Sequence, residues 1–202
     1  MKVVDSIKSS INEAKDGSLF FNSDFSQFDD QYVNKVLADL VRQKALVRLA
    51  RGIYMKPEQT RFGLVFPSVD TIVNAIARRD NADVLPCGEA VLNMLGFSTQ
   101  VPMNYVYVTS GTARKITVGG RKITLKRVAP KNFAVKGAYT RLIVQAMKSI
   151  GQEHFGKEDA AHLLQLLRHH PEPDTIVQDL TVMPQWIKQE FVKLLKMIEY
   201  EK

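Results

Sequence analysis

Two short apolar runs, separated by an arginine–glycine pair, constrain the fold of this chain more than any other feature. Residues 46–49 and 53–55 each have the length and composition of a strand, and Arg51-Gly52 between them predicts a tight turn. Pro57 ends the unit, because proline cannot donate to a further strand ladder. The sequence therefore predicts a small hairpin with two arginines, Arg48 and Arg51.

Helical patterns precede this hairpin. Residues 3–14 place Val3, Val4, Ile7 and Ile11 at helical spacing. After a short apolar stretch at 19–21, Asn22-Ser23 is expected to cap a short helix through Phe25 and Phe28. Asp29 or Asp30 is expected to cap a longer helix that runs to about residue 44. The buried stripe of that helix is expected to contain Val33, Val36, Leu37, Leu40 and Val41.

Helix, short helix, longer helix and hairpin is the element order of a winged helix-turn-helix, although other small α+β domains share it. In that fold the third helix enters the major groove and the hairpin reaches flanking phosphates. Amide and lysine side chains near the start of the third helix suit base edges or phosphates. The alternative is that these side chains form an ordinary solvated helix face without DNA contacts. Tyr32 is also spaced to pack inward, four residues before Val36, and Tyr54 fits core packing and DNA contact equally. The expected DNA-binding residues are Gln31, Tyr32, Asn34, Lys35, Arg42, Arg48 and Arg51.

The rest of the chain predicts a second domain. Residues 58–66 are expected to form a linker after the 1–57 domain, and residues 67–202 an α+β domain with a small antiparallel sheet. Ser68 caps a predicted helix, and strands are expected near 84–85, 105–108, 115–118 and 122–126, with Gly119-Gly120 as a hairpin turn. Helices are expected at 88–95, 137–151, 157–169 and 184–200. The predicted fold class is α+β, with an N-terminal winged helix-turn-helix and terminal helices.

The charge is uneven along the chain. The 202 residues contain 28 Lys and Arg against 21 Asp and Glu, a net charge of +7, which favours polyanionic partners. Residues 114–136 hold eight cations and no acid. Ile116, Val118, Ile123 and Leu125 alternate there, so we expect the cations to share the opposite face. This second basic surface is expected to contact nucleic acid or protein, or to be only a solvated strand pair. It contains Arg114, Lys115, Arg121, Lys122, Lys126 and Arg127.

Signals for catalysis or metal binding are weak. Glu158 and His162 have a four-residue spacing but no third ligand, and Cys87, the single cysteine, has no obvious nearby base. We expect no enzymatic activity, no cofactor and no metal. No apolar run reaches the ~18–20 residues of a membrane span, and no signal-peptide core is present, so we expect a cytoplasmic protein without a membrane partner.

The wing region resembles a known family. The segment LADLVRQKALVRLARGIYMKP, 37–57, is similar to AbiEi-type antitoxins of type IV toxin–antitoxin systems, in which abortive infection defends bacteria against phage. The shared pattern is Leu46, Arg48, Arg51, Gly52, Ile53 and Tyr54. Residues 67–102 resemble the segment after the wing in AbiEi-like transcriptional regulators, and the likeness covers roughly residues 1–130. Asp29-Asp30 departs from it, because two carboxylates repel phosphates.

The resemblance implies a specific function. Such a protein would be an antitoxin and autorepressor that binds inverted repeats in its own promoter, with two copies on one operator. Its second domain would counteract a nucleotidyltransferase-like toxin encoded next door, without needing a stable complex. The alternatives are a winged-helix regulator without a toxin, whose second domain binds a ligand, protein or RNA, and a module whose second domain binds RNA or is enzymatic.

Overall fold

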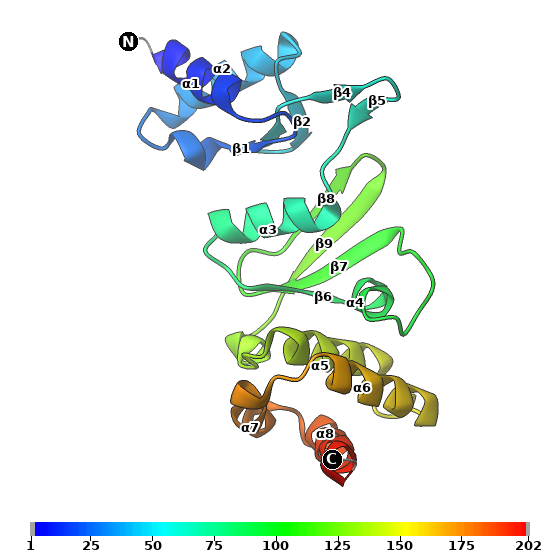
Figure 1. Ribbon diagram of the computed structural model, residues 1–202. Helices are drawn as coiled ribbons and strands as arrows, with labels where there is room; N and C mark the ends of the chain where they lie inside the picture. The colour runs from blue at the N-terminus through cyan, green and yellow to red at the C-terminus, as the bar shows by residue number, and fades with distance from the viewer. Residues whose placement is uncertain (1–2, 201–202) are drawn as a thin grey trace. The chain divides into compact units, whose positions relative to one another are not determined.

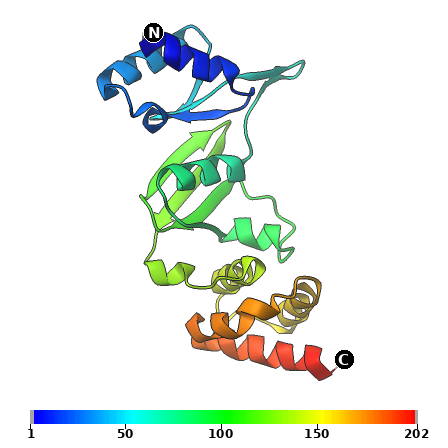
Figure 2. The same cartoon turned by 60° about the vertical axis from the view of Figure 1, so that its left-hand side comes forward.

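The computed structural model describes residues 3–200 and has the expected α+β composition (Figures 1 and 2). The chain divides into two compact units. One contains Met1–Ala82 with Lys115–Ile123, and the other contains Asp83–Arg114 with Thr124–Lys202. No helix in residues 3–200 is both long enough and apolar enough to cross a membrane.

The first unit begins with an order of elements compatible with a winged helix. The helix α1 (Val3–Glu13) is followed by β1 (Leu19–Phe21), the 3-10 helix η1 (Asn22–Phe25), α2 (Asp30–Arg42), β2 (Val47–Ala50) and β3 (Ile53–Met55). The strands form a sheet of order β1-β3-β2. The apolar stretch at 19–21 is thus a strand, which local sequence did not reveal. Its partner β3 lies more than thirty residues away, and Phe21 pairs with Ile53.

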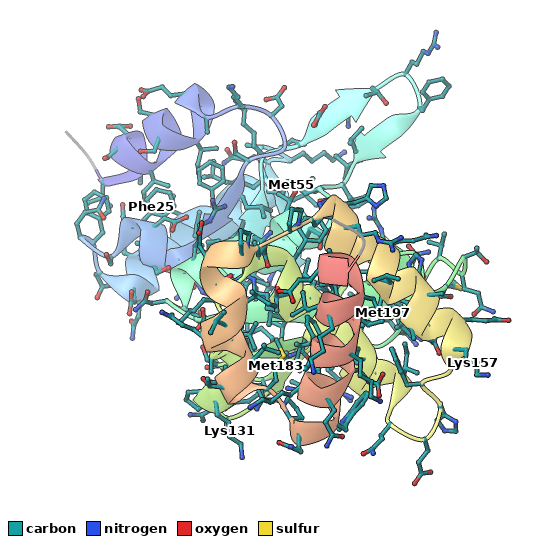
Figure 3. The ribbon with its side chains drawn as sticks, turned by 60° about the horizontal axis from the view of Figure 1, so that its bottom comes forward. Phe25, Met55, Lys131, Lys157, Met183 and Met197 are labelled. Atoms are coloured by element: carbon teal, nitrogen blue, oxygen red, sulfur yellow. The ribbon has the colours of Figure 1, made fainter. Side chains whose placement is uncertain are left out.

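One apolar core holds these elements together. Ile7 and Ile11 of α1, Phe25 of η1 and Leu37 of α2 are all at most 4% exposed. Phe25 and Met55 are labelled in Figure 3. The predicted stripe of the longer helix is confirmed at Val33, Val36, Leu37 and Leu40, with Val41 partly buried against the core.

A second hairpin occupies the stretch expected as a linker. The strands β4 (Glu58–Thr60) and β5 (Gly63–Val65) pair with each other in a two-stranded sheet. The helix α3 (Val69–Arg79) follows, and the Ser68 hydroxyl accepts a hydrogen bond of 3.1 Å from the backbone N–H of Thr71. Ser68 is therefore the N-cap that the sequence predicted.

The remaining four strands form a sheet of order β6-β7-β9-β8. They are β6 (Val84–Cys87), β7 (Asn104–Thr109), β8 (Arg114–Val118) and β9 (Arg121–Arg127). The short helix α4 (Glu89–Met94) lies between β6 and β7 in the sequence. Gly119 and Gly120 have φ values of 55° and 79°, the left-handed pair that a type I′ hairpin requires. The predicted hairpin turn is confirmed.

Helices complete the second unit. After η2 (Pro130–Phe133) come α5 (Ala138–Ile150), α6 (Lys157–His169), α7 (Pro173–Val182) and α8 (Gln185–Tyr200). The helix α7 was not predicted, because its region contains Pro171, Pro173 and Pro184. Pro173 occupies the first position of α7, where its missing N–H costs no helical hydrogen bond. Ile143, Met147, Leu163 and Phe191 are fully buried in the core of these helices.

Candidate nucleic-acid interface

The start of α2 determines which acidic side chains lie near the expected DNA face. The Asp29 carboxylate accepts a hydrogen bond of 2.9 Å from the backbone N–H of Tyr32, so Asp29 is the N-cap of α2. Asp30 is the first residue of the helix and is exposed. One of the two carboxylates is therefore engaged in capping, and its charge lies at the favourable end of the helix dipole.

The candidate residues of α2 all lie on its exposed side. Gln31, Asn34 and Lys35 are exposed, and Tyr32 is 42% exposed, so it does not pack inward. At the other end of the helix, Arg42 forms an ion pair of 2.6 Å with Asp39. The charge of Arg42 is thus partly compensated within α2.

Asn34 is held by a residue that the sequence did not single out for function. The Asn22 side-chain Nδ2 donates a hydrogen bond to Asn34 Oδ1. Asn22 was expected to help cap the short helix, but Phe21 is the N-cap of η1, and the Asp24 carboxylate accepts from the Phe21 backbone N–H at 2.8 Å. The Asn22 amide is thereby left to contact α2. No spacing rule connects residues 22 and 34, so only the structure reveals this pair.

The β2–β3 hairpin, which is the expected wing, carries both predicted arginines on its surface. Arg48 and Arg51 are exposed, and the Nε of Arg48 donates to the carbonyl of Ala50 at 3.4 Å. Gly52 has a φ of 70°, and a Cβ there would lie 3.3 Å from Asn22 Oδ1, so the turn favours glycine. Tyr54 is 5% exposed and belongs to the core.

A cavity brings these parts together. It has a volume of about 530 Å³ and is lined by Asn34 of α2 and by Arg48 and Arg51 of the wing. Arg79 of α3 and Asn22 also line it. The remaining lining residues are Phe21, Ser23, Gly52 and Tyr54. No acidic side chain lines this cavity, so it suits an anionic ligand. We call it the arginine cavity.

The arginine cavity does not gather every candidate. Gln31, Tyr32, Lys35 and Arg42 are not among its lining residues. Arg79 was not predicted from the sequence, because α3 lies outside the segment that resembles a winged helix. Its only sequence signal is the basic pair Arg78-Arg79 at the end of a helix.

The second basic surface is divided between two faces. Along β9, Lys122 and Lys126 alternate with the buried Ile123 and Leu125, so these lysines point to the opposite side of the strand. Arg121 and Arg127 have the same parity as Ile123 and Leu125.

Along β8, Lys115 lies opposite Val118 in parity, whereas Arg114 shares the side of Val118 and is half-buried. The expectation that all these cations share one face is therefore wrong. Only the lysines lie opposite the apolar side chains, because strand parity separates them from the arginines.

A family model covers most of these features. The model is described as a family of unknown function (DUF6088), and it matches residues 6–175. The chain belongs to the DUF6088 family. The match includes the arginine cavity, β4–β5, and the whole sheet β6-β7-β9-β8. A comparison with curated proteins found no match.

The other candidate residues of this DUF6088 chain have structural partners. His162 Nε2 donates to the Leu95 carbonyl at 2.7 Å, and the imidazole packs edge-on against Phe97. His162 is thus half-buried against Leu95 and Phe97. Within residues 3–200, no cluster of three or more His, Cys, Asp or Glu side chains has the arrangement to hold a metal ion. Burial raises the pKa of the Cys87 thiol, and the nearby Lys126 ammonium only partly offsets this, which disfavours the thiolate.

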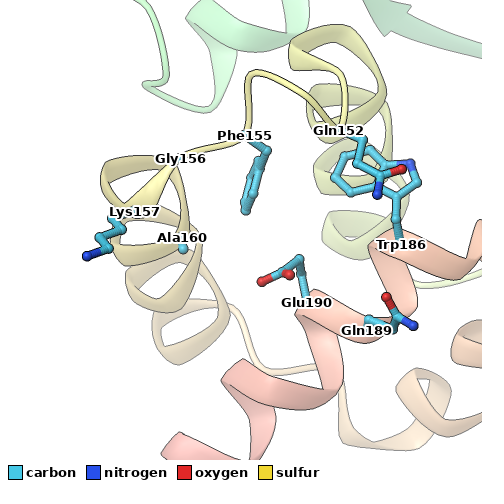
Figure 4. Close-up of a pocket in the computed structure, with 8 residues that line it drawn as sticks. All are labelled: Gln152, Phe155, Gly156, Lys157, Ala160, Trp186, Gln189 and Glu190. Carbon is cyan, nitrogen blue, oxygen red and sulfur yellow. The ribbon is translucent and has the colours of Figure 1, made fainter.

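A cavity among the C-terminal helices lacks such a concentration of one charge (Figure 4). It has a volume of about 410 Å³, and its aromatic walls are Phe155 and Trp186. Lys157 points away from the centre of the view, whereas Glu190 points inward. Glu190 forms an ion pair of 2.7 Å with Lys193. The arginine cavity is therefore the better candidate for a functional site.

Proposed function

We propose that this chain is a sequence-specific DNA-binding protein of the cytoplasm and a transcriptional regulator. The observation that carries the proposal is the arginine cavity, because it joins Asn34 of the expected recognition helix to Arg48 and Arg51 of the expected wing. No carboxylate lines this cavity, and the chain has a net charge of +7. These features favour a polyanion over a cationic or neutral ligand.

The division of labour follows from the chemistry of the side chains. Arginine presents a planar fork of N–H donors that matches phosphate oxygens, and the wing places two of them beside α2. An asparagine amide can form two hydrogen bonds with adenine in the major groove, into which an α-helix fits. Arg48 and Arg51 would thus position the protein, while Asn34 and its exposed neighbours would read bases.

Fluorescence anisotropy tests the proposal directly. The probe is labelled DNA from just upstream of the gene, with a scrambled duplex of equal length as the control, each at two salt concentrations. Tight, selective and salt-dependent binding to the upstream DNA is expected. Equal and weak binding to both duplexes would overturn it, because the positive charge would then act only as a general polyanion surface.

We propose further that the chain is an antitoxin and autorepressor that acts on inverted repeats in its own promoter. This rests on the resemblance of residues 37–57 and 67–102 to AbiEi-type proteins. Co-expression with the neighbouring gene is the test. If that gene encodes a nucleotidyltransferase-like toxin, growth should be rescued by this chain and not by a vector control.

A regulator that senses a partner through its second unit is the other candidate. An apolar cavity of about 400 Å³ lies among α6, α7 and α8, with Leu167, Ile176, Leu180 and Leu195 in its lining. Val177, which also lines it, is 72% exposed. Well-formed apolar pockets are the usual sites of ligand binding. DNA binding without any toxin rescue would favour this candidate over the antitoxin.

A further inference from the structure

The end of α3 contributes to the arginine cavity although it lies outside the expected winged helix. Arg79 is the last residue of α3 and lines the cavity with Arg48 and Arg51. The helix α3 also contacts β1, which belongs to the three-stranded sheet. Both elements belong to the same compact unit.

The guanidinium of Arg79 is held in place by two neighbours. Its Cζ lies 4.7 Å from the centre of the Phe21 ring, a cation–π contact. Its Nε and Nη2 each lie 2.8 Å from Asp80 Oδ1. Its side chain is 18% exposed. An arginine fixed in this way loses little conformational freedom when a ligand binds.

The held guanidinium keeps donors available for a ligand. Arginine has five N–H donors, and the two contacts to Asp80 use one on Nε and one on Nη2, which leaves three uncommitted to Asp80. Asn22 also lines the cavity, and its buried Oδ1 has no hydrogen-bond partner. The polar groups here are thus not all satisfied by one another.

We propose that Arg79 binds a phosphate group in the arginine cavity, and that the phosphate belongs to the DNA backbone. The nucleic-acid-binding unit would then extend from the winged-helix segment through α3. The inference rests on the proposed function. Phosphate is the chemistry that fits, because three guanidiniums and no carboxylate line the cavity.

The neighbouring Arg78 provides a matched control. Arg78 and Arg79 lie on the same helix and carry the same charge, but only Arg79 lines the arginine cavity. In the full chain, Arg79→Ala should weaken binding to the upstream duplex by about ten- to a hundredfold, the range for a lost hydrogen bond to a charged group. Arg78→Ala should change the dissociation constant by less than about threefold, as for a charge at the edge of the site.

Two further variants separate a direct contact from other effects. Arg79→Lys keeps the charge but lacks the planar fork, and should still weaken binding several-fold. The double variant Arg79→Ala with Asp80→Ala leaves no unpaired carboxylate and keeps the net charge of the wild type. It should bind as weakly as Arg79→Ala. Circular dichroism and thermal melting check that each variant is folded.

The outcomes distinguish the source of the phosphate. Equal losses for Arg78→Ala and Arg79→Ala, or wild-type affinity in the double variant, would overturn the inference. If Arg79→Ala abolished binding of inorganic phosphate or ATP, measured by calorimetry, but left DNA binding intact, the DNA backbone would be the wrong source. If the wild type bound neither duplex selectively, the proposed function itself would fail.

Discussion

At the scale of single residues, Asn34 is the side chain best placed to read a base. It is exposed on α2, it lines the arginine cavity, and its amide is oriented by Asn22. We expect Asn34→Ala to cost about 1–3 kcal/mol in binding to the cognate duplex and little on scrambled DNA. The measurement is the ratio of the two dissociation constants, with Asn74→Ala on the exposed side of α3 as the control. An unchanged ratio would remove Asn34 from the base-reading role.

Arg51 and Lys56 come from the same basic stretch but have different partners. Lys56 Nζ donates to the carbonyls of Asn12 and Ala14, at 3.0 and 2.7 Å, and lies 3.3 Å from Asp16. It therefore satisfies carbonyls at the end of α1, whereas Arg51 is exposed at the wing turn.

Replacing Lys56 with alanine should affect stability, whereas replacing Arg51 should affect DNA binding. Lys56→Ala should lower the free energy of unfolding by about 1–2 kcal/mol, because charged hydrogen bonds at a helix end are lost. Arg51→Ala should leave stability unchanged and flatten the log–log salt dependence of DNA binding by about one unit. Urea unfolding and anisotropy at several salt concentrations measure the pair. A loss of salt dependence in Lys56→Ala would contradict the assignment.

At the scale of elements, the start of α5 depends on two carboxylates from α7 and its N-cap. The buried Asp179 accepts hydrogen bonds from the backbone N–H groups of Lys136 and Gly137, at 2.7 and 2.9 Å. Glu172 accepts from the N–H groups of Tyr139 and Thr140. Two acidic side chains thus satisfy the N–H groups that a helix leaves unpaired at its start.

This arrangement requires glycine at the N-cap of α5. A Cβ on Gly137 would lie 2.3 Å from Glu172 Oε2 and 2.9 Å from Asp179 Oδ2. Gly137→Ala should therefore destabilise the protein by about 2 kcal/mol or more, since the carboxylates must move away from the helix. Gly156 is the N-cap of α6, and the nearest atom to its Cβ position is 3.8 Å away. Gly156→Ala should change stability by less than about 1 kcal/mol, measured by urea unfolding.

Glu172 should make this region sensitive to acid. Burial tends to raise the pKa of Glu172, but hydrogen bonds from the backbone of Tyr139, Thr140 and Ala138 and from the Thr140 hydroxyl outweigh it, and its pKa lies below the usual value. A lowered pKa contributes stability that is complete above the unfolded pKa of about 4.3 and is lost as the pH falls through the folded pKa.

The test compares unfolding in mild acid. Between neutral pH and about pH 5, the stability of the wild type should not depend on Glu172 titration. Below about pH 4.3 it should fall more steeply than that of Glu172→Gln. Asp174→Asn, an exposed acid on α7, is the control and should retain the wild-type slope. Parallel curves for the wild type and Glu172→Gln would contradict this origin.

At the scale of the whole molecule, the chain has a net charge of +7. The salt dependence of its DNA binding should report how many phosphates it neutralises. If each copy neutralises about three phosphates and two copies occupy an inverted repeat, the log–log salt slope should be roughly −5. A single bound copy should give a slope of roughly −3. Anisotropy across a salt series measures the slope, and sedimentation of the complex counts the copies independently. A slope near zero would contradict phosphate binding altogether.

Local patterns predicted many elements because their signals are short-range. The stripe of α2, the Ser68 cap and the Gly119-Gly120 turn depend on neighbours within a few residues, and all three are confirmed. The strand β1 and the helix α7 were missed. A three-residue strand needs a distant partner, and α7 begins at a proline that local rules also interpret as a break.

The sequence by itself determined the α+β class, the uneven positive charge and the exposed arginines of the wing, because these follow from composition and short-range periodicity. Only the tertiary structure decided which of those cations share a site. It brought Arg79 of α3 beside Arg48 and Arg51, and it placed Lys56 against the carbonyls at the end of α1. Each of these outcomes depends on contacts between distant segments or on register, which packing of the core determines.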